Sequence, residues 1–332
     1  MGGGGAKALP PGVHVTVYIG KRVLISAGML ILISMLIFLL LRLAPGNPID
    51  AYINPSIAIS QKQLATLRSQ LGLDGPLTTQ YLAWLGNVLR GNFGYSAVDF
   101  RPVSLLIAER AGPTLLLMGS GILLAVLVGT ASGVIAAVWR NTVLDYSLAV
   151  LAFLGIATPA FLAALIGMYV FAVRLHWFPA GGYRTPGQPL TAGNVAEHLI
   201  LPAVILSLYY TATIMRYTRA ALLDVLNLDY VRTARAKGLP EWLVILRHGL
   251  RNALVPVVTL IGASVGSAVG GAIFIESVFG WPGMGLLFID AVDARNYPVI
   301  MGISLVIGVG VLCANLLTDV TYVLLDPRIQ YG

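Results

Sequence analysis

The chain has 332 residues, of which 57% are hydrophobic and only 11% charged, and its formal net charge is +7 at pH 7. Soluble domains carry roughly 25% charged residues, so this composition excludes a water-soluble protein. A basic balance is also typical of nucleic-acid binding, but here the charges lie in short segments between apolar runs. That distribution indicates a membrane protein whose partners include lipid and do not include nucleic acid.

A membrane-spanning helix needs about 20 mostly apolar residues. Charge-free runs of this kind predict an all-α protein with six transmembrane helices. They lie at Val23–Leu41, Ala111–Trp139, Tyr146–Val173, Leu199–Met215, Asn252–Ile275 and Asn296–Thr318. The first run is too long for a cleaved signal peptide, so we expect an uncleaved span. The fourth is the shortest, and Thr158-Pro159 predicts a kink in the third.

The Lys and Arg residues near span ends predict the orientation. With the N-terminus inside, cytoplasmic segments hold 12 of the 21 Lys and Arg residues. We therefore expect a multi-pass protein of the cell inner membrane with both termini in the cytoplasm. The predicted parts are a cytoplasmic segment 1–22, a first span 23–43, an extracytoplasmic lobe 44–110, a core domain 111–325 and a cytoplasmic tail 326–332.

The segment between the first two spans predicts a small helical lobe. Two groups of apolar residues recur at helical spacing, Leu64, Leu67 and Leu71 and then Tyr81, Leu85 and Val88. Gly91 is placed to end the second helix. A linker would lack this periodicity, so a structured lobe on the outer surface is favoured.

The long cytoplasmic loop 217–251 predicts a short helix, Tyr230–Lys237, which Asp229 caps and Gly238 ends. Pro240 is suited to begin another helix. An eight-residue helix is about 12 Å long and is too short to be stable alone, so it must pack on something. Its small residues allow close approach by a partner, and its flanks are basic. These residues are Thr233, Ala234 and Ala236, and Arg232, Arg235 and Lys237.

No catalytic or metal-binding pattern is present in the sequence. The histidines are scattered, no phosphate-binding loop occurs, and the single cysteine, Cys313, excludes a thiolate zinc site. Glu276 and Asp319 lie at span ends, where interfacial placement or bonding to backbone is favoured over proton transfer. A self-contained secondary transporter or channel would need mid-span charges or an inverted repeat, and the sequence shows neither. An intramembrane enzyme would need a paired nucleophile and base. Uphill transport would therefore need an external motor.

Gly262, Gly266 and Gly270 recur every four residues in the fifth span. Small residues at this spacing let two helices approach closely in lipid. We therefore predict that this glycine row is a helix-packing face.

The loop also resembles a known signature. Residues 229–239, DYVRTARAKGL, and 247–253, RHGLRNA, with Pro256, resemble the coupling loop of dipeptide, oligopeptide and nickel permeases, which are subunits of binding-protein-dependent ABC importers. Residues 71–74, 80–85, 279–285 and 326–328 resemble other parts of this family. The general importer loop begins Glu-Ala-Ala, where this chain has Arg232, Thr233 and Ala234. That departure is usual for the peptide and nickel branch. Asn92 stands where the family leads us to expect an acid.

The resemblance implies the type I ABC importer permease fold and a non-enzymatic transport subunit, closest to dipeptide permeases. The short helix would dock on a cytoplasmic ATPase. The implied coupling residues are Asp229, Tyr230, Arg232, Thr233, Ala234, Arg235, Ala236, Lys237 and Gly238. The implied partners are a second homologous permease, two ABC ATPases that bind ATP and magnesium, and an extracytoplasmic binding protein. This chain itself would bind no cofactor or metal. Short peptides are the favoured substrate, with nickel complexes, haem and glutathione as alternatives.

Overall fold

The computed structural model describes residues 11–43 and 74–325, which form helices joined by short connections. The helices are α1 (Pro11–Leu43), α3 (Leu77–Leu89), α4 (Val103–Val138), α5 (Val143–Ala157), α6 (Ala160–Gly167), the π-helix η2 (Met168–Arg174), α7 (Ala192–Leu226), α8 (Asp229–Ala236), α9 (Glu241–Leu243), the π-helix η3 (Val244–Leu250), α10 (Arg251–Phe279), α11 (Met284–Asp293) and α12 (Tyr297–Leu325). In this part of the chain the only extended pairing is an isolated bridge between Tyr95 and Pro102. The predicted all-α class is confirmed.

Within residues 11–43 and 74–325, five helices are long and apolar enough to cross a membrane, and a bent helix pair is the sixth if it counts as one span. The five are parts of α1, α4, α7, α10 and α12. The shortest predicted span, Leu199–Met215, lies within the 35-residue helix α7. Its apolar run is short because 61% of its spanning window is buried by protein, so little of it needs lipid-compatible side chains. Pro202 is accommodated inside this helix.

The third predicted span is broken. Helices α5 and α6–η2 meet at an angle of 108°, a far larger change than the kink predicted at Thr158-Pro159. Thr158 has extended backbone angles, φ −88° and ψ 120°, as expected of a residue before proline. The predicted kink is found at the predicted place but is a full break, because the helix ends at Ala157 and restarts at Ala160.

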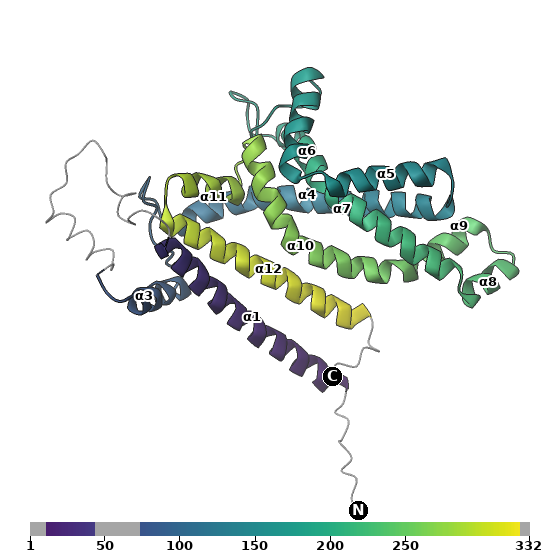
Figure 1. The fold of residues 1–332 in the computed structure, drawn as a ribbon, viewed down its shortest axis with the longest axis horizontal. Helices are drawn as coiled ribbons and strands as arrows, with labels where there is room; N and C mark the ends of the chain where they lie inside the picture. Colours follow the sequence, from purple (N-terminus) through teal and green to yellow (C-terminus); the bar gives the residue numbers. More distant parts are fainter. Residues whose placement is uncertain (1–10, 44–73, 326–332) are drawn as a thin grey trace, which may run out of the picture.

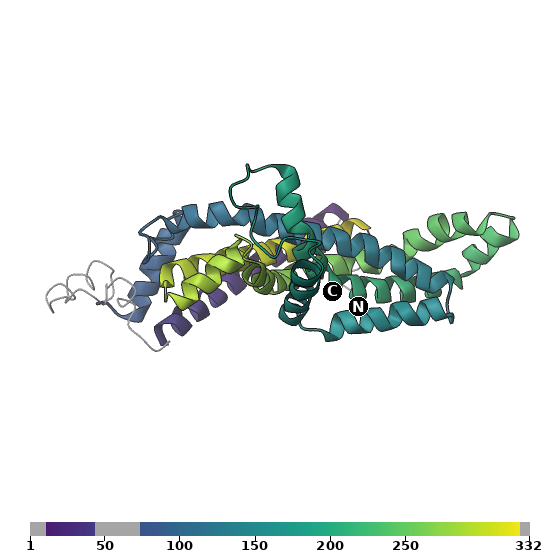
Figure 2. The same ribbon diagram turned by 90° about the horizontal axis from the view of Figure 1, so that it is seen from above.

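The helices are arranged around α7. Figure 1 and Figure 2 show α4, α7 and α10 crossing the middle of the molecule, α8 and α9 at one end of the long axis, and α3 and α11 towards the other. Helices α1 and α12 lie side by side (Figure 1). Helices α4 and α7 approach closely at two glycines of α4. A Cβ added at Gly133 would lie 2.7 Å from the Met215 oxygen, and one at Gly129 2.9 Å from the Thr211 oxygen.

The turn from α10 to α11 is organised by the buried Glu276. The Thr114 hydroxyl donates to Glu276 Oε1 over 2.7 Å, and the backbone N–H groups of Gly285 and Leu286 donate to Oε2 over 2.6 and 3.2 Å. This bonding to backbone agrees with the role favoured from the sequence. A Cβ at Gly283 or Gly285 would overlap the carboxyl group, so the glycines of this turn make room for Glu276.

Helix α11 was not predicted, because its residues follow the turn motif 279–285 and precede an obvious span. Its first residue and the turn before it are each joined to α4. The Met284 N–H donates to Thr114 Oγ1 over 2.8 Å, and the Trp281 indole N–H donates to the Pro113 oxygen over 2.9 Å. Helix α11 is therefore fixed to α4 as well as to α10.

The lobe is described in part. Helix α3 contains the second predicted apolar repeat, and Gly91 follows it with φ +79°. The first repeat, Leu64 to Leu71, and the tail 326–332 lie outside the described residues. So do residues 1–10 of the predicted N-terminal segment. Asp319 falls on α12.

Replacing Glu276 tests the turn. Glu276→Ala leaves the Thr114 hydroxyl and the Gly285 and Leu286 N–H groups without their acceptor, and each such buried group costs about 1–3 kcal/mol. We expect a lower Tm for the purified protein in detergent. Asp290→Ala, at an exposed carboxylate of α11, is the matched control and should leave Tm unchanged. An unchanged Tm for Glu276→Ala would contradict this account of the turn.

Candidate coupling site

Helix α8 packs on its own chain through one narrow face. Val231 is fully buried and Ala234 nearly so, and both lie against the buried Val244 of η3. Val225 and Leu226 of α7 and Leu239 complete this cluster. A helix of eight residues is not stable alone, and this contact supplies the support that the sequence requires.

The start of α8 differs from the prediction. Its N-cap is Leu228, with no side-chain cap hydrogen bond, and Asp229 is the first helical residue. Asp229 therefore does not cap the helix. Its carboxylate lies at the positive end of the helix dipole and meets Arg232 at 3.5 Å on the exposed surface, where such pairs contribute little.

The end of α8 is a tight turn that depends on glycine. Gly238 has φ +78°, and its N–H donates to the Arg235 oxygen over 2.9 Å while the Leu239 N–H donates to the Ala234 oxygen over 3.4 Å. These two bonds form a Schellman motif. The motif turns Leu239 back onto the cluster beneath α8, so Gly238 ends the helix as predicted.

Arg235 joins three elements of this region. Its guanidinium donates to both carboxylate oxygens of Glu241 in α9, over 2.6 and 3.2 Å, and to the Leu226 oxygen at the end of α7 over 3.5 Å. The hydrogen bond from Arg235 holds the pKa of Glu241 below its usual value. The pKa is lowered only in the folded state, so the pair of Arg235 and Glu241 stabilises the fold at neutral pH. This contribution is lost as the pH falls through the folded-state pKa of Glu241.

Tyr230 attaches the other flank of α8. Its hydroxyl donates to the His248 oxygen over 3.3 Å, and the Asn252 amide donates to the same hydroxyl over 2.7 Å. Helix α8 is thereby tied to η3 and to the start of α10, in addition to α9 and α7.

The remaining face of α8 is open. Arg232, Thr233, Ala236 and Lys237 are exposed, and so are Asp229 and parts of Tyr230 and Arg235. Ala234, one of the small residues expected to face a partner, points inward instead. The surface that a partner can reach therefore carries the small side chains of Thr233 and Ala236 and the basic ones of Arg232 and Lys237.

A second buried cluster connects this region to the spans. Leu222 of α7, Ile245 of η3, Ala253 of α10 and Ala137 of α4 pack together. Gly249 of η3 allows the close approach, since a Cβ there would lie 3.0 Å from Leu222 Cδ1. Because η3 contacts both α8 and this cluster, a displacement of α8 would also displace groups on α4, α7 and α10.

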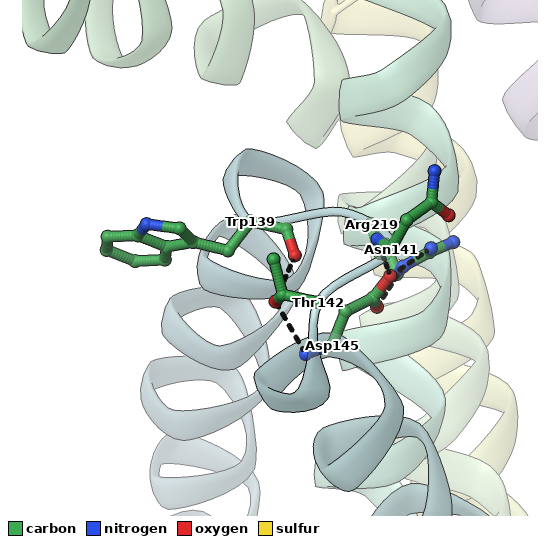
Figure 3. A network of polar contacts seen from close by, with 5 residues as sticks. All are labelled: Trp139, Asn141, Thr142, Asp145 and Arg219. Atoms are coloured by element: carbon green, nitrogen blue, oxygen red, sulfur yellow. Dashed lines mark hydrogen bonds and ion pairs between the residues drawn. The ribbon is translucent and has the colours of Figure 1, made fainter.

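An ion pair that was not foreseen ties α5 to the same end of the molecule (Figure 3). Arg219 of α7 donates to both oxygens of the buried Asp145, over 2.7 Å from Nε and 2.7 Å from Nη2. The Asn141 N–H adds a third bond of 2.9 Å. Such a bidentate pair fixes geometry as well as charge. It joins the α4–α5 turn to α7 about two turns before the end of α7.

One signal in the sequence points to half of this arrangement. Thr142 is the N-cap of α5 and accepts from the Asp145 N–H, and its own hydroxyl donates to the Trp139 oxygen over 2.6 Å (Figure 3). A Thr followed three residues later by an acid before an apolar run is typical of a helix start. The partnership with Arg219, which is 74 residues away, has no local signal.

The glycine row of α10 divides between two environments. A Cβ at Gly262 would collide with Thr318 of α12, and one at Gly266 would lie 3.2 Å from Val311 Cγ1. Gly270 has nothing within 4 Å of a Cβ. The packing role predicted for Gly270 therefore finds no partner within the described chain. Among all the residues that the structure describes, no group of three or more His, Cys, Asp or Glu side chains could hold a metal ion.

A bundle of apolar helices with a short, exposed helix at one end is the architecture expected of a membrane transport subunit. Comparison with known proteins identifies the family. Residues 129–331 match the binding-protein-dependent transport system inner membrane component, and residues 15–115 match the N-terminal part of such membrane components. The chain belongs to this family, the permeases of ABC importers, and has its all-helical type I fold.

Three relatives show which branch of the family is nearby. A Brucella suis protein, provisionally named a peptide permease, is 58% identical over 94% of this chain and 98% of its own length. The oligopeptide transport system permease of Bacillus subtilis is 42% identical over 95% of this chain and 99% of its own. The glutathione transport system permease of Salmonella paratyphi A is also 42% identical, over 95% and 99%.

The turn at Gly238 can be tested without a partner. Gly238→Val places a β-branched residue at φ +78°, which costs about 1–2 kcal/mol, and no neighbouring atom is close enough to add a clash. Gly238→Asn, which tolerates this region, is the control. We expect peptides covering α8 to exchange amide hydrogens about tenfold faster in the Val variant. Equal exchange in the two variants would contradict the capping role.

Proposed function

We propose that this chain forms half of the translocation pathway of an ATP-driven importer of short peptides. A second homologous permease forms the other half, two cytoplasmic ABC ATPases supply ATP with magnesium, and an extracytoplasmic binding protein delivers the substrate. Both termini lie in the cytoplasm, so the end of the molecule that carries α8 faces the ATPases. The end that carries α3 and α11 faces the binding protein.

The observation that carries this proposal is the attachment of α8. The helix is held on one face by Val231 and Ala234. Its opposite face is exposed and carries small and basic side chains. Through η3 and the end of α7 it contacts the clusters that hold α4 and α10. A force applied to the open face would move several membrane helices together, which is what coupling to an ATPase requires.

Buried carboxylates of the described spans support an external motor over a self-contained secondary transporter. Asp145 is paired with Arg219, and Glu276 accepts hydrogen bonds from Thr114 and the start of α11. Both groups are occupied in holding helices together. Neither stands free in the manner of a coupling site for a proton or sodium ion.

Peptides are favoured because the relatives named for peptide and oligopeptide transport include the one that is 58% identical to this chain. Glutathione, itself a small peptide, is the nearest alternative, followed by nickel complexes and haem. Calorimetry on the cognate binding protein with a dipeptide, glutathione, a nickel complex and haem separates them. Tight binding of the dipeptide supports the proposal, and binding of nickel or haem alone contradicts it.

Coupling is tested by exchanging the charges of Arg235 and Glu241. In the importer reconstituted with all partners, Arg235→Glu places two acids side by side and should remove most peptide uptake and most of the transport-linked ATP hydrolysis. The double variant Arg235→Glu/Glu241→Arg restores the pair and should recover both activities in large part, because the bond lies within this chain.

The matched control is the exposed pair between Arg101 and Glu109 near the opposite end of the molecule. Arg101→Glu breaks a pair of similar exposure without touching α8, and its ATP hydrolysis should stay coupled to transport. Full uptake by Arg235→Glu, in a complex that contains the ATPases, would refute the assignment of α8.

A further inference from the structure

Helix α3 is attached to α1 by side chains from two of its turns. The Tyr81 hydroxyl and Ser34 Oγ share a hydrogen bond of 2.8 Å, and Ser34 is buried by this contact. The Phe38 ring lies 5.6 Å from the Tyr81 ring and 6.4 Å from the Trp84 ring, centroid to centroid. In Figure 1, α3 lies beside the end of α1 and away from α12.

The attachment points lie deep along α1. The membrane-spanning part of α1 is Gly20–Leu43, and Ser34 precedes its end by nine residues, or about 13 Å of helix. The hydrocarbon layer is about 30 Å thick, so Ser34 lies well inside it. Tyr81 therefore contacts α1 within its candidate spanning part, so α3 lies beside the span and not beyond its end.

The surface of α1 around this contact is apolar and exposed. Only 11% of its spanning window is buried, and Leu36, Leu39 and Leu40, next to the attachment points, are exposed. In a bilayer these side chains need an apolar cover, and acyl chains can supply it. Lipid that covers this part of α1 would also reach α3, because α3 lies directly beside it.

The composition of α3 suits this position. Its thirteen residues, LTTQYLAWLGNVL, include no Asp, Glu, Lys, Arg or His, and none of them is buried. Leu82 and Leu89 are 64% and 79% exposed and share one flank of the helix at 3.6 residues per turn. Ala83 and Asn87 occupy the opposite flank. Tyr81 and Trp84 belong to the residue types that gather at membrane interfaces.

We propose that α3 lies in the membrane interface, with Leu82 and Leu89 among lipid acyl chains and Asn87 towards the headgroups and water. The lipid is that of the outer leaflet in the orientation given under Proposed function. A helix of thirteen residues without a buried side chain is marginal in water. Lipid covers its apolar flank and supplies the missing support.

Accessibility of spin labels distinguishes lipid from the other two environments of this flank. Cysteines are placed at Leu82, Leu89, Ala83 or Asn87 in a Cys313→Ser background, because Cys313 is exposed. The labelled chain is assembled with its partners in lipid nanodiscs. Collision rates are measured with oxygen, which concentrates in acyl chains, and with a water-soluble nickel chelate.

Labels at positions 82 and 89 should collide with oxygen several-fold more often than with the chelate, and the label at 87 should show the reverse. Low collision rates with both reagents at 82 and 89 would show that a protein, such as the second permease, covers this flank. Frequent collisions with the chelate there would show water. Either result would overturn the proposal.

A second measurement avoids the labels. Lipids brominated near the headgroup end of the acyl chain quench tryptophans at shallow depth. Trp84→Phe should lower the quenched share of the protein's fluorescence, whereas Trp242→Phe, at an exposed residue of α9, should not lower it. An unchanged quenched share for Trp84→Phe would also overturn the proposal, and neither measurement depends on transport.

Discussion

The close packing of α4 on α7 is the constraint from which the rest of the molecule is built. Two glycines of α4, Gly129 and Gly133, let its backbone approach that of α7, as small residues do between helices in lipid. Protein then buries 61% of the spanning window of α7. It continues beyond this contact to hold Asp145 through Arg219 and to support α8 through Leu226.

This arrangement makes the α8 end of the molecule one mechanical unit. Val231 and Ala234 hold α8 on η3, while Arg235 and Tyr230 hold its two flanks. The ion pair of Asp145 and Arg219 adds α5 to the unit. At the other end, Glu276 fixes α11 to α10 and α4. A movement that begins at α8 would therefore act on several packed helices together.

The sequence predicts much of this because its strongest signals are local. Apolar runs located the helices of the spans, and the glycine and spacing around residues 229–238 located α8. Other features escaped prediction for physical reasons. Pro159 announces a break without setting its angle, and the pairing of Asp145 with Arg219 joins residues 74 apart. Ala234 was expected outside because a small residue suits either a partner's surface or a tight internal contact. Burial of α7 by protein also shortened its apolar signal.

The claim that α8 is the docking element for an ATPase is tested most directly by crosslinking. A photoreactive amino acid at Thr233, on the open face of α8, should form an adduct with the ATPase subunit in the assembled, transport-active importer. The same amino acid at Tyr95, an exposed residue far from α8 in the sequence and the fold, should form none. Absence of a Thr233 adduct in an active complex, or equal adducts at both positions, would contradict the account.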